Sequence, residues 1–212
     1  MFEEFKGKVA VVTGGATGMG RAAARKFASL GAKVAVVTGH NIAGAEETVR
    51  LIQEAGGEAA AFQCNVSDES QVAAMVAAVA EKFGRIDYAF NTAGIGPDGV
   101  RILHCPLTQV TEKDWDTIVD TNMKGVFLCM KHELLQMQKQ GGPAAIVNPS
   151  SIGGLRMAPG FGAYGPSKAG VVALTQLAAR ENAAAGIRVN VVCPGPTEGT
   201  VLMDNSKASK PA

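Results

Sequence analysis

Short β-branched runs alternate with alanine-rich stretches along most of the chain. Six runs have the length and composition of buried strands: 8–13, 32–38, 58–66, 85–91, 144–148 and 187–192. Five stretches have the residue spacing of helices: 21–31, 43–55, 67–84, 111–139 and 163–185. Strands that are buried on both faces and alternate with helices predict a parallel sheet with right-handed crossovers. The sequence therefore predicts a doubly wound α/β fold, which binds ligands beyond the carboxyl ends of its strands.

The chain has 212 residues, enough for one α/β domain with a substantial core. No internal repeat or low-complexity segment divides it. The one irregular stretch rich in proline and glycine, 92–107, is too short to be a domain linker. We expect a single domain over residues 1–212.

Composition narrows the classes of function. The formal net charge is +1 and the basic residues are scattered, which argues against a nucleic-acid surface. No apolar run approaches the ~18 residues of a membrane span, and the opening "MFEEFKGK" holds no apolar signal core. Charged residues make up 18% of the chain, against roughly 25% in soluble domains, so we expect surface buried between subunits. The expectation is a cytoplasmic homo-oligomer, either a dimer or a tetramer.

The sequence predicts no metal site. The four cysteines are widely spaced and match no zinc pattern: Cys64, Cys105, Cys129 and Cys193. The three histidines show no metal-ligand spacing: His40, His104 and His132. We expect the cysteines to be free thiols in a reducing compartment.

The segment "TGGATGMG" (13–20) joins the first predicted strand to the first predicted helix. Gly14, Gly18 and Gly20 lack a Cβ, so the backbone can turn tightly and approach a pyrophosphate. The helix N-terminus offers the same group free N–H donors and a partial positive charge. An ordinary glycine-rich turn is the alternative. Its position at the first strand–helix turn of a doubly wound sheet favours dinucleotide binding.

The segment "YGPSK" (164–168) places a phenol and an ammonium four residues apart, one turn along a helix. In isolation this pattern more often gives a half-buried tyrosine and a solvated lysine. Taking a proton from an alcohol at neutral pH needs a phenol pKa ~3 units below its usual ~10, a preference of about 4 kcal/mol for phenolate. One cation about 4 Å away, at an effective dielectric of about 20, supplies roughly that amount. Tyr164 and Lys168 therefore suit an acid–base pair.

Several separated segments resemble the short-chain dehydrogenase/reductase family, which has a Rossmann-like fold. The matching segments follow the family's order over essentially the whole chain: "TGGATGMG" (13–20), "NTAG" (91–94), "NMKGVF" (122–127), "IVNPSS" (146–151), "YGPSK" (164–168) and "RVNVVCPG" (188–195). One such segment would be weak evidence for the family, whereas the full set in the family's order is very specific to it. The resemblance implies an NAD(P)-dependent oxidoreductase that interconverts a secondary alcohol and a ketone.

The resemblance assigns a catalytic tetrad: Asn122, Ser151, Tyr164 and Lys168. Ser151 is preferred over Ser150 because the family's serine lies 13 residues before its tyrosine. Tyr164 is then the general acid/base, and Ser151 holds the substrate oxygen and stabilises its charge. A polar strand end is the alternative for both serines.

The resemblance also implies which residues bind the cofactor. They lie in the glycine turn, after four of the strands and on the last helix: Gly14, Thr17, Gly18, Met19, Gly20, Gly39, His40, Asn65, Val66, Asn91, Ala93, Gly94, Tyr164, Lys168, Pro194, Gly195 and Thr197.

Asn122 also has an argument from spacing. Trp115, Ile118, Val119 and Asn122 fall at i, i+3, i+4 and i+7, so the amide should point inward from an apolar face. An unsatisfied buried amide costs roughly 1–3 kcal/mol. A structural hydrogen bond is one interpretation, and the family's water-mediated proton relay to the lysine is compatible with it.

The residues after the second strand bear on the nucleotide. NAD users in such folds carry an acidic residue there for the ribose 2′-OH. Here "VVTGHN" (36–41) has Gly39 in that place and His40 where a basic residue often stands. No carboxylate repels a 2′-phosphate, so NADP is favoured over NAD. Asn65 replaces the aspartate that usually contacts the adenine, and its carbonyl can accept the same hydrogen bond.

The sequence departs from the family pattern in several places. Thr92 replaces an asparagine, and Pro149 lies near the end of a strand, where a missing N–H is tolerated. Around Thr197 the family's threonine contact to the nicotinamide amide is displaced by one residue. The family's last helices and seventh strand lie beyond the end of the sequence. We therefore expect half of the substrate lid to be absent and the sixth strand to be an exposed edge unless a partner covers it.

The predicted substrate pocket has two walls. Residues 94–107 form one, and the other is apolar: Leu155, Met157, Phe161, Gly162 and Ala163. The sequence specifies no substrate beyond a small alcohol or ketone. Two functions stay open. The complete tetrad favours an active oxidoreductase, and the short C-terminal region favours a truncated dinucleotide-binding protein with little or no catalysis.

Overall fold

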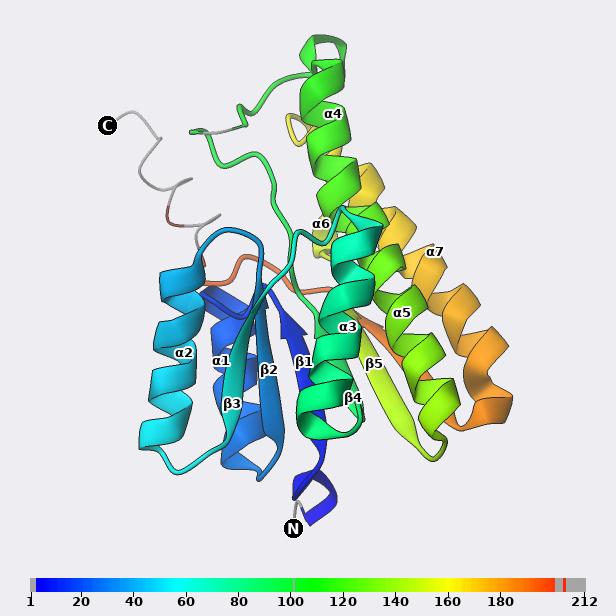
Figure 1. Cartoon of the computed structure of the whole chain (residues 1–212). Coiled ribbons are helices and arrows are strands. Elements are labelled where there is room, and N and C mark those ends of the chain that lie inside the picture. Colours follow the sequence, from blue (N-terminus) through cyan, green and yellow to red (C-terminus); the bar gives the residue numbers. More distant parts are fainter. Residues whose placement is uncertain (1–2, 101, 201–203, 205–212) are drawn as a thin grey trace.

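A six-stranded parallel sheet forms the centre of the molecule (Figure 1), with strand order β3-β2-β1-β4-β5-β6. The computed structural model describes residues 3–100, 102–200 and 204. The strands are β1 (Val9–Thr13), β2 (Lys33–Thr38), β3 (Ala59–Gln63), β4 (Tyr88–Asn91), β5 (Ala144–Pro149) and β6 (Ile187–Val192). The chain order reverses between β1 and β4, which is the switch point of a doubly wound sheet and confirms the predicted fold class.

Helices cover both faces of this sheet. The longer ones are α1 (Gly18–Ser29), α2 (Ile42–Glu54), α3 (Glu69–Phe83), α4 (Glu112–Val119), α5 (Gly125–Gln140) and α7 (Tyr164–Asn182). Side chains alternate along each strand, so Val11 contributes to a core with α3, α5 and α7, whereas Val12 contributes to a core with α1 and α2. The short turns are Glu3–Phe5, Leu107–Gln109, α6 (Ile152–Leu155) and Ala183–Ala185.

The predicted helix 111–139 is interrupted. A π-helical turn, Asp120–Lys124, separates α4 from α5. Asn122 lies on this turn and is fully buried, as its spacing predicted, but Trp115 is 38% exposed. The predicted apolar face is therefore wrong for Trp115, because α4 extends past the end of the sheet and its first turns have little core to pack against (Figure 1).

The first helix begins earlier than the sequence predicted. α1 begins at Gly18 and not at residue 21, so the end of the glycine turn is also the first turn of the helix. The backbone donors at the start of α1 therefore lie directly beside the carboxyl end of β1.

At the start of α3, Asp68 caps the helix by accepting a hydrogen bond from the Gln71 amide.

β6 is the edge of the described sheet. Ile187 and Val189 pack inward, whereas Arg188 and Asn190 are exposed. One face of this strand therefore lies at the surface of the described chain, as expected for a sheet of six strands.

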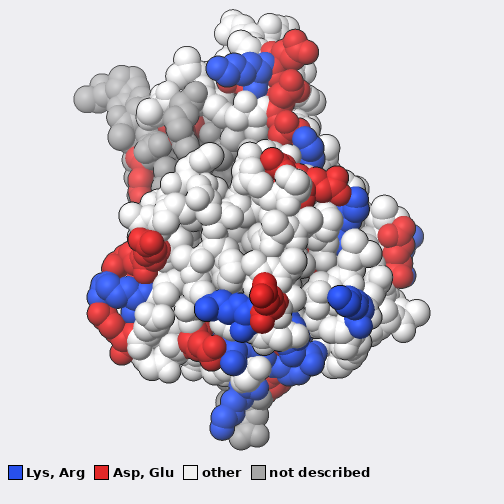
Figure 2. Space-filling view, viewed as in Figure 1, with Lys and Arg blue, Asp and Glu red and all other residues white. Residues whose placement is uncertain are grey.

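The surface carries charges of both signs. Figure 2 shows Lys and Arg interspersed with Asp and Glu on the face that it draws, and uncharged atoms cover most of that face. Among the described helices, none is both long enough and apolar enough to cross a membrane.

Candidate active site

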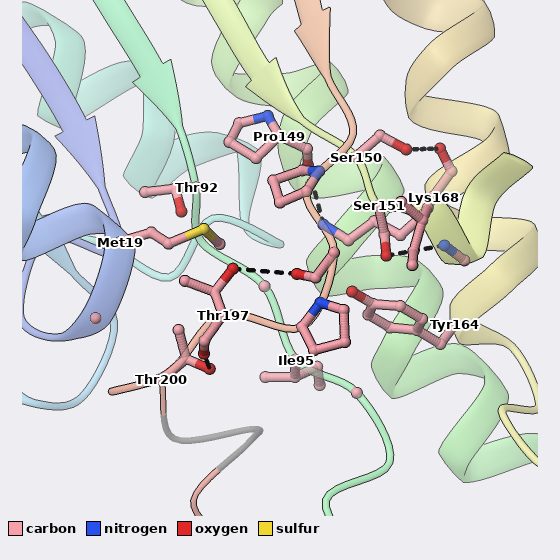
Figure 3. Close-up of a pocket in the computed structure, with 18 of the residues that line it drawn as sticks. Met19, Thr92, Ile95, Pro149, Ser150, Ser151, Tyr164, Lys168, Thr197 and Thr200 are labelled. Carbon is pink, nitrogen blue, oxygen red and sulfur yellow. Dashed lines mark hydrogen bonds between the residues drawn. The ribbon is translucent and has the colours of Figure 1, made fainter.

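A cavity of about 400 Å³ opens where the carboxyl ends of β1, β4 and β5 meet (Figure 3). Most of the residues predicted for the site line it: Gly14, Thr17, Gly18, Met19, Gly20, Gly94, Ser151, Tyr164, Lys168, Pro194, Gly195 and Thr197. The glycine turn and the Tyr–Lys pair, which are far apart in the sequence, thus face one space at the switch point of the sheet.

The glycine turn has the geometry of an anion site. Gly14 has a φ of +66°, and a Cβ there would lie 3.0 Å from the Cα of Ala93. A Cβ at Gly20 would collide with the carbonyl of Gly14. Thr17 precedes α1 without a side-chain capping bond, so its hydroxyl does not occupy the first N–H groups of the helix. These donors and the missing Cβ atoms fit a phosphate of a dinucleotide.

The two adjacent serines have different orientations. Ser150 is buried and its Oγ donates to the carbonyl of Lys168 at 2.7 Å. The Oγ of Ser151 accepts a hydrogen bond from the Gly153 amide at 3.0 Å and lies beside the Tyr164 phenol (Figure 3). Burial raises the pKa of Tyr164, and hydrogen bonding with Ser151 opposes that rise. The orientation agrees with the choice of Ser151 over Ser150.

Lys168 is 7% exposed and its ammonium faces the strand end. Its Nζ donates to the carbonyl of Pro149 at 3.1 Å and lies 5.9 Å from the centroid of the Tyr164 ring. Burial lowers the pKa of Lys168 to about 8. The predicted lowering of the tyrosine pKa is not found here: the ammonium is held at Pro149, and burial of the phenol dominates.

Asn122 acts from behind the cavity. Its Oδ1 accepts from the Ile95 amide at 2.8 Å, and its Nδ2 donates to the Ile95 carbonyl at 2.8 Å and to Ser167 Oγ at 3.2 Å. A Cβ at Gly94 would lie 3.2 Å from Asn122 Oδ1 and 3.4 Å from Lys168 Nζ. The amide therefore fixes the loop after β4 and lies close to the lysine. The proton relay stays a prediction.

The residues predicted to contact the adenine and its ribose lie apart from this cavity. His40 and Asn65 line a second, open hollow together with residues of α4, among them Glu112 and Asp116. A Cβ at Gly39 would meet only the Cys64 carbonyl, at 3.7 Å, so a larger side chain has room there. Val66, also predicted to bind cofactor, is buried.

Asn65 is already hydrogen bonded. Its Oδ1 accepts from the amide of Ser67 at 3.2 Å and from the Ser67 hydroxyl at 2.9 Å. Because both acceptor positions of that oxygen are in use, the predicted bond to adenine requires one of these contacts to open.

The Arg21 side chain is not directed at the hollow that His40 and Asn65 line. Its guanidinium donates to the Ala16 carbonyl at 2.5 Å, the Gly44 carbonyl at 3.2 Å and Thr48 Oγ1 at 3.0 Å. These bonds hold α1 against α2.

Two predicted cofactor contacts, Asn91 and Ala93, lie behind the cavity wall. The Asn91 amide turns into the core, where it donates to Glu133 Oε2 at 2.9 Å and Asn148 Oδ1 at 3.1 Å. The Ala93 amide donates to Thr13 Oγ1 at 3.2 Å. The Asn91 side chain therefore supports the turn from inside, and a cofactor contact at Asn91 stays a prediction.

The predicted apolar wall is mostly wrong. Phe161 lines the cavity, but Leu155 and Met157 are 63% and 56% exposed and lie outside the lining. The short helix α6 turns Leu155 outward, and the sulfur of Met157 packs against Gly165. Gly162 and Ala163 also lie outside the lining. Among the described residues of the other predicted wall, 94–107, only 94–96 line the cavity.

Sequence reasoning did not single out several lining residues, including Ile152, Arg156 and Thr200. The Cγ2 of Thr200 lies 3.3 Å from where a Cβ of Gly18 would be, so the segment after β6 closes over the glycine turn. Arg156 and Thr200 lie in irregular segments, and Ile152 begins the four-residue helix α6, so hydrophobic periodicity gave no signal for them.

A switch-point cavity that joins a glycine turn suited to a phosphate with a Tyr–Lys pair is typical of nicotinamide-dependent oxidoreductases. A family model described as short chain dehydrogenase matches residues 8–211. The chain belongs to the short-chain dehydrogenase/reductase family, and it is an oxidoreductase of the NAD(P)-dependent kind.

Curated relatives include dehydrogenases and reductases. The chain is 37% identical over 211 residues to a 2,5-dichloro-2,5-cyclohexadiene-1,4-diol dehydrogenase of Sphingobium indicum, covering 98% of this chain and 81% of the relative. It is 42% identical over 188 residues to the 3-oxoacyl-[acyl-carrier-protein] reductase FabG of Staphylococcus aureus, covering 89% and 74%.

Solved structures agree with this assignment. Levodione reductase superposes with a TM-score of 0.87 at 35% identity, covering 97% of this chain and 77% of that one. NAD+-bound xylitol dehydrogenase superposes with a TM-score of 0.85 at 34% identity, covering 91% and 71%.

Proposed function

We propose that the protein interconverts a secondary alcohol and a ketone by hydride transfer, with Tyr164 as the general acid/base. The observation that carries the proposal is the shared cavity, which the glycine turn enters from one side and Ser151, Tyr164 and Lys168 from the other. The relatives named above are a diol dehydrogenase and an oxoacyl reductase, so both directions of such a reaction occur among them.

Different residues of the cavity have different roles in this reaction. Gly14, Gly18 and Gly20 form the cradle that would hold the pyrophosphate, and a bound nicotinamide supplies or accepts the hydride. The Ser151 hydroxyl holds the substrate oxygen beside the phenol. In reduction, Tyr164 donates its proton to that oxygen, and burial, which raises the pKa of the phenol, keeps the proton available. That donation leaves a phenolate, which the Lys168 ammonium favours, and in oxidation this phenolate accepts the proton of the alcohol.

We propose a modest preference for NADP over NAD. No carboxylate stands at Gly39, although the space there would admit one. The preference should be weak for two reasons. Arg21 is hydrogen bonded elsewhere, and the carboxylates of Glu112 and Asp116 line the same hollow as His40, where they oppose a 2′-phosphate. The expected discrimination is less than about tenfold, or about 1.4 kcal/mol.

One experiment tests the reaction and the nucleotide together. Binding of NADPH and NADH is measured by fluorescence, and their oxidation is followed with a panel of ketones, for wild type, Tyr164→Phe and Tyr88→Phe. Tyr88 is the matched control because its hydroxyl donates to the Glu4 carbonyl, outside the cavity. We expect turnover in wild type and Tyr88→Phe, and binding without turnover in Tyr164→Phe.

Each other outcome has a meaning. Turnover retained by Tyr164→Phe would refute the mechanism. Binding without turnover in wild type would favour the alternative, a dinucleotide-binding protein with little or no catalysis. A dissociation constant for NADH well below that for NADPH would refute the nucleotide preference.

A further inference from the structure

Two buried atoms without partners belong to a pair of side chains that already share a hydrogen bond. Among the described residues, the buried side-chain atoms without a hydrogen-bond partner are Asn91 Oδ1 and Glu133 Oε1. The same residues are joined by the bond from Asn91 Nδ2 to Glu133 Oε2, at 2.9 Å. Asn91 is 1% exposed and Glu133 is fully buried. Both unpaired atoms are oxygens, so what this site lacks is a donor.

We propose that Glu133 keeps its proton at mildly acidic to neutral pH and donates it to the amide oxygen of Asn91. A carboxylic acid facing a primary amide can form two parallel hydrogen bonds, one from the amide N–H and one from the acid O–H. A single proton thus gives both unpaired oxygens a partner. An ionised carboxylate only accepts hydrogen bonds, so it cannot pair with Asn91 Oδ1.

The surroundings of Glu133 favour the neutral form. The described chain contains no ion pair to this carboxyl, and an unpaired buried charge is strongly disfavoured. Burial raises the pKa of Glu133 to about 7, opposed by the hydrogen bond from Asn91. On α3, Glu69 is directed away, where it pairs with Lys131 and His132 on the outer side of α5.

Apart from the Lys168 ammonium, the remaining titratable groups nearby stay neutral where Glu133 titrates. Cys129 lies one turn earlier on α5, and Cys64 follows β3. Burial raises the pKa of both thiols, that of Cys64 to about 11. β5 contributes the amide of Asn148. α7 contributes the hydroxyl of Thr175 and, two turns earlier, Lys168, whose ammonium is held at Pro149.

The pair is connected to the walls of the cavity. Asn91 also donates to Asn148 Oδ1 at 3.1 Å, and Asn148 Nδ2 donates to Thr175 Oγ1 at 3.0 Å. These bonds tie β4, β5 and α7 together directly below the cavity. Asn91 precedes the turn of Thr92 and Gly94, which line the cavity. Glu133 is therefore a positioning residue that fixes Asn91 and, through it, this turn. Its effect on cofactor rests on the proposed function, whereas the pairing does not.

Carbon-13 NMR tests the pairing directly. In protein labelled at the glutamate carboxyl carbons, the signal that disappears in Glu133→Gln identifies Glu133. We expect a protonated chemical shift at pH 6 and a midpoint near pH 7. A midpoint at or below the ordinary value for glutamate, about 4.3, would overturn the proposal. Glu81→Gln, at an exposed position on α3, is the matched control and should leave this signal unchanged.

Nucleotide binding tests the positioning role. Glutamine at position 133 can form both hydrogen bonds without a titrating proton, whereas methionine can form neither. The NADPH affinity of wild type relative to Glu133→Gln should fall severalfold between pH 6 and pH 8.5, and Glu133→Met should bind weakly throughout. Because Lys168 is common to all three proteins, its titration cancels in the ratio. A constant ratio would overturn the positioning role. Absence of binding in every protein would overturn that role and the proposed function together, and the NMR midpoint would still decide the pairing.

Discussion

Lys168 is a cation whose position works against the stability of the fold. It is 7% exposed, its ammonium has one carbonyl partner, and burial lowers its pKa from 10.5 to about 8. The unfolded chain holds this proton more tightly than the folded chain does. The buried ammonium is thus kept at the expense of folding free energy, a cost that is common at functional sites.

The pH dependence of stability should reveal this. Between pH 8 and pH 10.5 the unfolded state binds more protons at Lys168 than the folded state does. The contribution of this group therefore makes the free energy of unfolding increase as the pH rises. Relative to Lys168→Met, we expect wild type to gain about 1.4 kcal/mol per pH unit in that window. Urea unfolding at several pH values measures the difference. Lys113→Met, at an exposed lysine, is the control and should parallel wild type; parallel curves for Lys168→Met as well would refute the lowered pKa.

The sequence could identify some residues of the site but not others. Ser151 and Tyr164 stand in recognisable segments, and their spacing selected the serine that lines the cavity beside the phenol. Glu133 shares a helix face with Cys129, Met130 and Met137, which is a weak signal of burial. Its partner Asn91 is distant in sequence, and only the folded sheet brings the two together.

At the scale of elements, local signals were enough for the strands and most helix ends. They failed at the junction of α4 and α5, because a π turn adds one residue and rotates all later side chains around the helix. α4 is too short for its apolar spacing to reveal such a shift. The glycine turn was recognisable because its requirement is steric and local: a Cβ at Gly14 or Gly20 would lie too close to a backbone atom.

Gly20→Ala tests that steric requirement. The new Cβ would meet the Gly14 carbonyl, so the backbone must move, at a cost of about 1–3 kcal/mol in the free energy of unfolding. We expect NADPH affinity to fall at least tenfold, because the displaced atoms form the anion cradle. Urea unfolding and a fluorescence titration measure the two effects. Gly56→Ala is the control: with a φ of +82° and nothing within 4 Å, it should cost about 1–2 kcal/mol and leave affinity unchanged. Equal affinities for all three proteins would contradict the cradle.

For the whole molecule, the amino-acid composition and the exposed apolar side chains both favour association of several copies of the chain. Charged residues make up 18% of the chain, and large apolar side chains remain exposed on two adjacent helices: Phe127 (44%) and Leu135 (55%) on α5, and Leu177 (53%) on α7. The low share of charged residues predicts buried subunit surface without indicating which surface, since that depends on the packing of α5 beside α7.

We therefore predict a homo-oligomer that uses this surface. Light scattering should give wild type a mass of at least two chains of 21.8 kDa. Leu135→Glu should shift the protein toward monomer, because burying a leucine contributes roughly 1.5–3 kcal/mol and a buried unpaired carboxylate opposes contact. Ala74→Glu adds the same charge at an exposed position of α3 and should keep the wild-type mass. A wild-type mass of one chain would refute association, and an unchanged mass for Leu135→Glu would place the interface elsewhere.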